Sequence, residues 1–297
     1  DVVIPSTKGI SHDFTLSFLE KSAPQALAKW ESLKQDYKAL GSYEKQTFLE
    51  LDSVKEKLQT IRESIKQAFC NYETERPRLK DLNSWLKEVE GKKSFLMVRS
   101  SSNEDSGTVV NAGGNLSESY VAPDIAAVLP SAGRVVASYF EESSLKKQME
   151  AGGEPLNEAL QLSVIFQELI GESPGADQTL PISLVLFTTE PNYSEASFHV
   201  TTISSTYGHG EGVVNNEGVQ TDTVYLVNSS NDSGQVIEIY QNQQKNQRLA
   251  PVRDSKGEVS LKMVDNAPEI VSQRSLKQEM TRRLLTLSRI IEDAFQC

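Results

Sequence analysis

Apolar residues recur at three- and four-residue steps through most of residues 25–90, a spacing typical of amphipathic helices. Gly41 and Ser42 interrupt this spacing and divide the segment into two helices. Before them, residues 1–22 hold a short extended piece and a helix that ends near Lys21, with Ser11 as its predicted N-cap. The repeating positions are Leu27, Trp30, Leu33, Tyr37 and Leu40, and then Leu51, Val54, Leu58, Ile61, Ile65 and Phe69.

We interpret the two helices of residues 25–90 as an antiparallel pair, a helical insertion that packs on a neighbouring lobe. The alternative is a coiled coil that binds a partner, but the heptads stop after about three repeats. A scaffolding protein built on this segment alone would keep its partner when residues 91–297 are deleted.

After residue 91 the pattern changes to short runs rich in Val, Ile, Thr and Phe, which are typical of strands. A strand at 95–98 enters a polar loop, and residues 124–149 are helical again. The end, residues 275–295, is predicted to be one amphipathic helix that begins with a capping box of Ser275 and Gln278. The pattern predicts an α+β fold, with further strands at 162–169, 182–188, 198–203, 223–227 and 236–240. The apolar face of the last helix comprises Leu276, Met280, Leu284, Leu287, Ile291 and Phe295.

Composition narrows the class of protein. Of the 297 residues, 38% are hydrophobic and 24% charged, as in globular domains. The net charge is −11 and no run of Lys and Arg forms a stripe, which argues against a nucleic-acid binder. The two cysteines and three histidines have no zinc-site spacing, and no disulfide framework is expected, which favours the cytoplasm. No run of about 18 apolar residues predicts a membrane span.

The first chemical candidate is the segment 95–107, where a strand delivers Arg99 into a loop that contains Ser100 and Ser101. A guanidinium beside clustered hydroxyl and backbone donors suits a polyphosphate. Glu104 and Asp105 would orient Arg99 or hold Mg²⁺. The alternative is a surface loop in which Arg99 forms a structural pair with a carboxylate.

Three further segments have candidate chemistry, each with a structural alternative. Gly113 and Gly114 would let backbone N–H groups approach an anion closely, or would form an ordinary turn. The strand at 163–171 would hold an adenine at its end, or would be a plain strand. In the turn 207–222, Glu211 is a candidate metal ligand or partner of a basic group. His209 there is either a proton-transfer residue or one that is solvated or bound by backbone.

Six segments between about residues 94 and 228 share their order and rough spacing with one family. In them the chain resembles the ATP-binding domain of the phosphoenolpyruvate synthase and pyruvate phosphate dikinase family, and looks closest to a divergent synthase-like branch. The segments are Val98-Arg99-Ser100-Ser101 with Glu104-Asp105, Ala112-Gly113, Val135-Val136-Ala137-Ser138-Tyr139-Phe140, Phe166-Gln167-Glu168-Leu169, Leu184-Val185-Leu186-Phe187-Thr188, and Gly208-His209-Gly210-Glu211 with Val213-Val214.

The resemblance implies an ATP-grasp-like, two-lobed nucleotide-binding domain that uses ATP and Mg²⁺. In relatives the counterpart of Arg99 contacts the transferred phosphates, and the glycine loop covers them. Such enzymes pass a phosphoryl group from ATP to a histidine of a separate swivelling domain, which makes this carrier domain an expected partner. The implied supporting residues are Ser100, Ser101, Gly113 and Gly114 for phosphates, Gln167, Glu168, Leu169 and Ile170 for adenine, and Glu211 for the shape of the site.

The chain also departs from the family pattern. The phosphate-binding lysine of relatives should fall upstream of Ile4, and Lys8 does not match its motif. The Glu, Gln and Arg that bind Mg²⁺ and phosphate in relatives follow the last helix, about where this chain stops. We therefore expect a fragment of a longer protein, and the alternative function is a nucleotide-binding pseudoenzyme or regulatory module without catalysis.

The expected organisation has four parts. Residues 1–24 are the N-terminal piece of the first ATP-grasp lobe, and residues 25–90 are the helical insertion. Residues 91–162 hold the phosphate-binding loops and helices of the first lobe. Residues 163–297 form the second lobe, with the adenine strand and the C-terminal helix.

Overall fold

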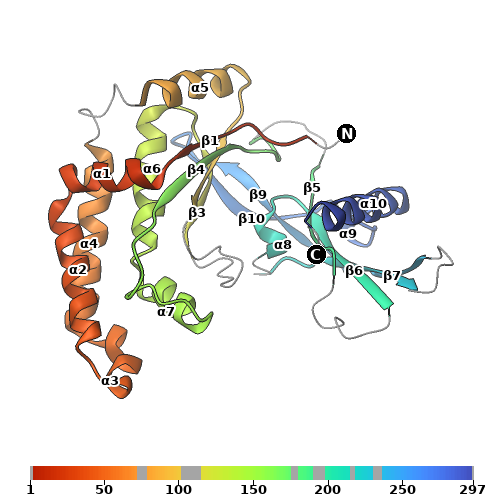
Figure 1. Cartoon of the computed structure of the whole chain (residues 1–297). Helices are drawn as coiled ribbons and strands as arrows, with labels where there is room; N and C mark the ends of the chain where they lie inside the picture. The colour runs from red at the N-terminus through yellow and green to blue at the C-terminus, as the bar shows by residue number, and fades with distance from the viewer. Residues whose placement is uncertain are drawn as a thin grey trace. The chain divides into compact units, whose positions relative to one another are not determined.

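The computed structural model describes residues 3–71, 79–101, 115–174, 180–189, 198–214, 218–229 and 236–295 (Figure 1). Contacts divide the chain into two compact units, Asp1–Ile170 and Gly171–Cys297. The division follows Ile170, whereas the sequence placed the second lobe from residue 163. The reason is that the strand β4 (Ser163–Glu168) pairs on both sides with strands of the first unit.

The first unit contains a four-stranded antiparallel sheet in the order β1-β4-β2-β3. One face of this sheet is apolar: Leu96 and Val98 alternate with more exposed residues on β2, and Val164 and Phe166 do so on β4. This alternation, with period two, assigns one face to the core and leaves the other open. The strands are β1 (Thr7–Ile10), β2 (Leu96–Ser101), β3 (Ser117–Val121) and β4.

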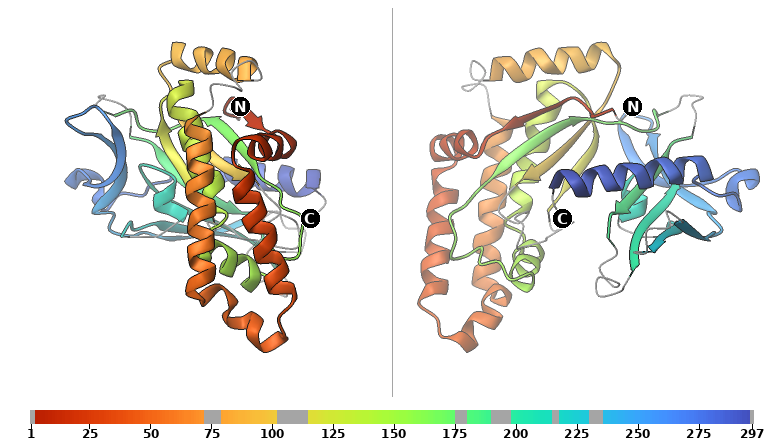
Figure 2. Two further views of the ribbon diagram at one scale, coloured as in Figure 1. Left: turned by 90° about the vertical axis from the view of Figure 1, so that its left-hand side faces the viewer. Right: turned by 45° about the vertical axis from the view of Figure 1, so that its right-hand side comes forward.

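Helices cover the apolar face of that sheet. The helix α6 (Ile125–Ser138) packs on β2, β3 and β4, and α4 (Asp52–Cys70) packs on α6. Two views show α4 beside α2 (Pro24–Lys38), as predicted for this segment (Figures 1 and 2). The other helical elements of the unit are α1 (His12–Ser22), α3 (Ser42–Thr47), η1 (Phe48–Glu50), α5 (Lys80–Gly91) and α7 (Glu142–Glu150).

One hydrophobic core joins the helices of residues 25–90 to the sheet, so this helical segment is an integral part of the first unit. Trp30 of α2 packs edge-on against Phe140, with ring centroids 5.1 Å apart, and Phe69 of α4 packs in the same way against Phe18 of α1 at 4.8 Å. Gly133 of α6 has no side chain, and this allows α4 and α6 to approach closely. A Cβ at Gly133 would lie only 2.7 Å from the Cβ of Phe69 on α4. The predicted cap of α1 is confirmed, since Ser11 Oγ accepts from the amide of Phe14 at 3.3 Å.

The second unit contains a four-stranded antiparallel sheet in the order β5-β6-β7-β8 and a two-stranded hairpin of β9 and β10. The four predicted strand segments after residue 180 are confirmed by the larger sheet, whereas the hairpin was not predicted. The strands are β5 (Ile182–Phe187), β6 (Phe198–Tyr207), β7 (Asp222–Ser229), β8 (Val236–Gln241), β9 (Gln247–Arg253) and β10 (Val259–Asp265), and short helices are α8 (Glu211–Val214) and α9 (Pro268–Val271).

The C-terminal helix α10 (Gln278–Phe295) corrects the prediction in two respects. It begins at Gln278, and the predicted capping box is wrong because Ser275 Oγ donates to the carboxylate of Asp222 instead. The helix packs through Leu284 and Leu285 against a small core in the sheet, and its buried residues are Thr281 and Ser288. The predicted apolar face is therefore partly exposed, with Met280 at 42% and Phe295 at 77%.

Candidate functional site

Arg99 lies on the open face of the first unit's sheet. It is exposed, whereas its neighbour Val98 is buried in the core. Strand pairing places Ile165 of β4 and Ser117 of β3 opposite Arg99, in a row that ends at Gly9 of β1. Among the residues that the structure describes, no carboxylate forms an ion pair with this guanidinium. An exposed, unneutralised guanidinium on a strand is a ready ligand for phosphate oxygens.

The two serines after Arg99 lie on opposite faces of the sheet. Ser101 shares the open face, where it pairs with Ser163. Ser100 faces the helices, and its Oγ accepts from Asn115 Nδ2 at 3.3 Å. The other residues predicted for this loop, namely Glu104, Asp105, Gly113 and Gly114, lie outside the described residues.

The predicted adenine segment is held at the end of β4. The amide of Glu168 donates to the carbonyl oxygen of Ser6 and that of Leu169 to the carbonyl oxygen of Phe95, both at 2.8 Å. Gln167 lies on the same open face as Arg99, with Nε2 at 3.4 Å from Thr7 Oγ1. Ile170, the last residue of this segment, is 68% exposed.

The side chain of Glu168 has a local electrostatic role. Lys92 Nζ and Ser94 Oγ each donate to its carboxylate at 2.9 Å. The hydrogen bond from Lys92 lowers the pKa of Glu168 below its usual value, and Ser94 adds to this shift. Both partners of the Glu168 carboxylate therefore belong to the first unit.

The turn 208–211 lies in the second unit, between β6 and α8. His209 is buried, and its Nδ1 accepts from the amide of Glu211 at 3.3 Å. Burial lowers the pKa of His209 below 6.5, against the opposing effect of the Glu211 charge. A neutral imidazole that accepts from backbone fits the structural interpretation of this histidine better than proton transfer.

Gly208 is the residue of this turn that requires glycine. Its φ is +89°, and a Cβ there would lie 2.4 Å from the carbonyl oxygen of Leu249. We expect Gly208→Ala to lower the free energy of unfolding by about 3 kcal/mol or more, because a backbone clash adds to left-handed strain. Gly257→Ala is the matched control, since φ is +87° and nothing lies within 4 Å. It should cost only about 1 kcal/mol in urea unfolding, and equal losses would contradict the clash.

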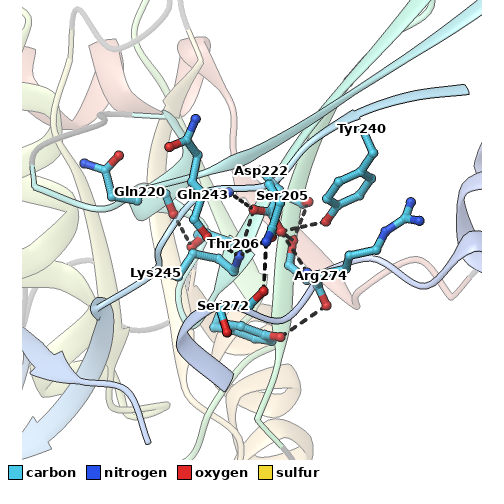
Figure 3. Close-up of polar contacts among 12 residues, drawn as sticks. Ser205, Thr206, Gln220, Asp222, Tyr240, Gln243, Lys245, Ser272 and Arg274 are labelled. Carbon is cyan, nitrogen blue, oxygen red and sulfur yellow. Dashed lines mark hydrogen bonds and ion pairs between the residues drawn. The ribbon is translucent and has the colours of Figure 1, made fainter. Parts of the chain in front are cut away.

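A buried polar cluster around Asp222 was missed by the sequence reasoning. Asp222 and Lys245 are both 0% exposed, and Lys245 Nζ lies 2.7 Å from Asp222 Oδ1. Figure 3 shows Lys245, Tyr240 and Gln243 around Asp222. Tyr240 OH donates to Asp222 Oδ2 at 2.6 Å, and Ser275 Oγ donates to the same oxygen at 2.8 Å. The amide of Gln243 donates to Oδ1 at 2.8 Å. The cluster therefore joins β7, β8 and the segment before α10 around one carboxylate.

The ionisation of Asp222 should make the free energy of unfolding depend on pH. Burial raises its pKa, but the hydrogen bonds from Gln243, Lys245, Tyr240 and Ser275 outweigh burial, and the net pKa is below 3.8. A depressed pKa in the folded state stabilises the fold above pH 3.8, and this contribution is lost as pH falls through the folded-state pKa. We expect wild type to lose more unfolding free energy than Asp222→Asn between pH 6 and pH 3. Equal losses in urea titrations would contradict this.

Two structural properties bear on cofactors and membranes. Within the described ranges, no cluster of three or more His, Cys, Asp or Glu side chains is arranged to hold a metal ion. No helix in the described part of the chain combines the length and apolar character needed to cross a bilayer.

Comparison with known proteins places these features in a family. A search of curated proteins found no match. The family model described as pyruvate phosphate dikinase, AMP/ATP-binding domain, matches residues 2–297, nearly the whole chain. This match includes both units and every candidate residue above. The chain therefore belongs to the family of AMP/ATP-binding domains of pyruvate phosphate dikinase.

Proposed function

We propose that this chain binds ATP with Mg²⁺ and supplies its phosphoryl group to a histidine of a separate swivelling domain, as in a phosphoenolpyruvate synthase-like phosphotransferase. The observation that carries the proposal is the exposed Arg99 guanidinium on an open sheet face. No carboxylate among the described residues neutralises it, and the chain belongs to an ATP-binding family. Phosphoryl transfer depends on positioning and charge neutralisation, which such a residue provides.

Each candidate residue has a role in this proposal. Arg99 binds the transferred phosphate oxygens, and Ser101 on the same face donates to a neighbouring oxygen. Ser100 lies on the opposite face, where its Oγ accepts from Asn115 Nδ2. The backbone at Gly113 and Gly114 covers the phosphates, and Gln167, Glu168, Leu169 and Ile170 hold the adenine. Glu211 shapes the turn, in which its backbone N–H donates a hydrogen bond to His209 Nδ1.

Mg²⁺ would enter with the nucleotide. Because Mg²⁺ keeps several waters and is usually bound by one or two carboxylates plus substrate phosphates, it needs no cage of three protein ligands. Glu104 and Asp105 are the carboxylates nearest to Arg99 in the sequence. When bound, the ion would neutralise charge on the phosphates.

Calorimetric titration tests the binding step. Mg·ATP titrated into the chain should bind with a Kd in the micromolar range, about 8 kcal/mol of binding free energy. Absence of heat from binding would overturn the proposal.

Transfer is tested separately on the native-length protein. Incubation with Mg·ATP should produce a phosphoryl group on histidine, which is stable in base and labile in acid and can be located by mass spectrometry. ATP binding without any phosphohistidine would instead indicate a regulatory nucleotide-binding module.

A further inference from the structure

A cavity in the first unit lies between α1, α2 and residues 159 and 160. Its volume is about 580 Å³, a size typical of small-molecule sites. None of the residues assigned above to the nucleotide lines this cavity. Leu16 and Leu27 are half-buried and pack against the core, so they form an apolar wall that rests on the rest of the unit. The other apolar lining residues include Pro24, Ala28 and Leu160.

The wall of the cavity contains a lysine that is well buried. Lys34 is 9% exposed, and lysine is rarely buried to this extent unless it is paired. Within the described part of the chain, its ammonium makes a single hydrogen bond, to Glu31 Oε1 at 3.2 Å. The side chain of Glu31 is 59% exposed. Because an ammonium has three donors, two of them remain for a ligand.

Two further residues of the wall supply donors. Trp30 is 1% exposed, and its Nε1–H has no hydrogen-bond partner among the residues that the structure describes. A buried donor without a partner costs free energy, which a ligand acceptor would recover. His12 Nδ1 accepts from the amide of Leu162 at 3.1 Å, so the neutral ring carries its proton on Nε2. The buried and half-buried polar groups of the wall therefore have donors to offer.

The carboxylates of the cavity lie on the exposed side. Glu20 and Glu31 both line it, and both are exposed to solvent. Carboxylates in water are hydrated and their charge is screened by salt. They leave room for one carboxylate at the donors, but they oppose a second negative charge on the same ligand.

We propose that this cavity binds a small monocarboxylic acid with an apolar body. The carboxylate accepts from Lys34, and the body packs on Leu16, Leu27 and Leu160. Charge-assisted hydrogen bonds from a buried ammonium set the preference for an acid, and the apolar wall supplies the hydrophobic contact. The inference goes beyond the proposed function, because neither the cavity nor its ligand involves ATP.

A set of four probes tests the chemistry. Calorimetric titration of 4-phenylbutyrate into the full chain should give a Kd of about 0.1 mM, typical of a good ligand of this size. The alcohol 4-phenylbutan-1-ol keeps the body but has no charge, and should bind about tenfold more weakly. Acetate has the charge without the body and should give no detectable heat. Phenylsuccinate adds a second carboxylate and should also bind more weakly than 4-phenylbutyrate.

The two indole N–H signals in nuclear magnetic resonance locate the ligand. The chain has two tryptophans, and Trp85→Phe assigns their signals. The Trp30 N–H signal should shift as 4-phenylbutyrate is added, because Trp30 lines the cavity. Trp85 is the internal control: its Nε1 donates to Ser6 Oγ at 2.8 Å, and its signal should stay in place.

Two variants separate the charge from the space. Lys34→Met keeps an apolar stem and should weaken 4-phenylbutyrate about tenfold without changing the affinity for the alcohol. Lys66→Met is the matched control, since Lys66 Nζ lies 3.0 Å from Glu63 Oε1 in a pair of the same spacing on α4. It should change neither affinity. Ala28→Phe fills the cavity from an exposed helix position and should abolish binding of both probes.

The outcomes divide clearly. Binding of 4-phenylbutyrate with a shift of Trp30 alone, and its loss in Lys34→Met but not in Lys66→Met, supports the proposal. Equal affinities for the acid and the alcohol would show an apolar cleft without preference for a carboxylate, and would overturn it. Absence of binding to wild type, or equal shifts of both indole signals, would also overturn it. Failure of the chain to bind ATP would remove the proposed function and leave this site intact.

Discussion

Arg99→Ala should weaken Mg·ATP binding about a hundredfold, because a bidentate, charge-assisted contact with phosphate contributes about 3 kcal/mol. The free energy of unfolding should change by less than about 0.5 kcal/mol, since Arg99 is exposed and has no ion pair among the described residues. Calorimetry and urea unfolding measure the two effects. Wild-type affinity for Mg·ATP in this variant would contradict the assignment of Arg99 as a phosphate ligand.

Two variants sharpen this test. Arg99→Lys keeps the charge but loses the planar fork, so its affinity should lie between those of wild type and Arg99→Ala. Arg134→Ala is the matched control: Arg134 is an exposed arginine of the same unit whose Nη2 lies 2.7 Å from Glu118 Oε2. It should bind ATP like wild type.

Asp222→Ala should destabilise the second unit by about 3–5 kcal/mol, because it leaves a buried ammonium without its counter-charge. Lys245 is 0% exposed, and Tyr240 and Ser275 lose the same acceptor. Replacing Lys245 with Met as well should recover part of the loss, since the charge is then gone. Glu279→Ala, in the exposed pair with Arg283, should cost about 0.5 kcal/mol or less.

The measurement must report on the second unit. Both tryptophans, Trp30 and Trp85, lie in the first unit, so their fluorescence follows that unit alone. Amide hydrogen exchange in β7 and β8 follows the strands around Asp222 instead. Faster exchange there in Asp222→Ala, with unchanged tryptophan fluorescence in urea, is the expected result. Unchanged exchange would show that the cluster contributes little to stability.

Local patterns predicted the elements whose side chains alternate between core and solvent. The helical steps from Val54 to Phe69 became α4, and the cap at Ser11 formed as expected. The apolar runs formed the strands β4 to β8. Such strands are predictable because the alternation of apolar and polar residues specifies which face is buried and therefore the register. Arg99 was expected at the end of a strand, and it lies on β2.

Elements without such a pattern could not be predicted. β3 has the sequence SESYV, which is mostly polar, and β9 contains Pro251, which disfavours a strand assignment. Their existence depends on pairing with β2 and β10, whose positions along the chain no local rule supplies. The last helix shows the same limit. Ser275 has the spacing of an N-cap, but its hydroxyl donates to Asp222 because the fold brings that carboxylate within reach.

The sequence by itself determined the α+β class, the family and the candidate phosphate residue, because these depend on periodicity and on ordered short motifs. Tertiary structure alone decided which side of the sheet Arg99 occupies, where the two units divide, and which partners hold Glu168 and Asp222. Asp222 and Lys245 are 23 positions apart, and Lys92 and Glu168 are 76 apart. Contacts over such separations arise only when the chain closes its loops and buries the charges together, and no local pattern encodes them.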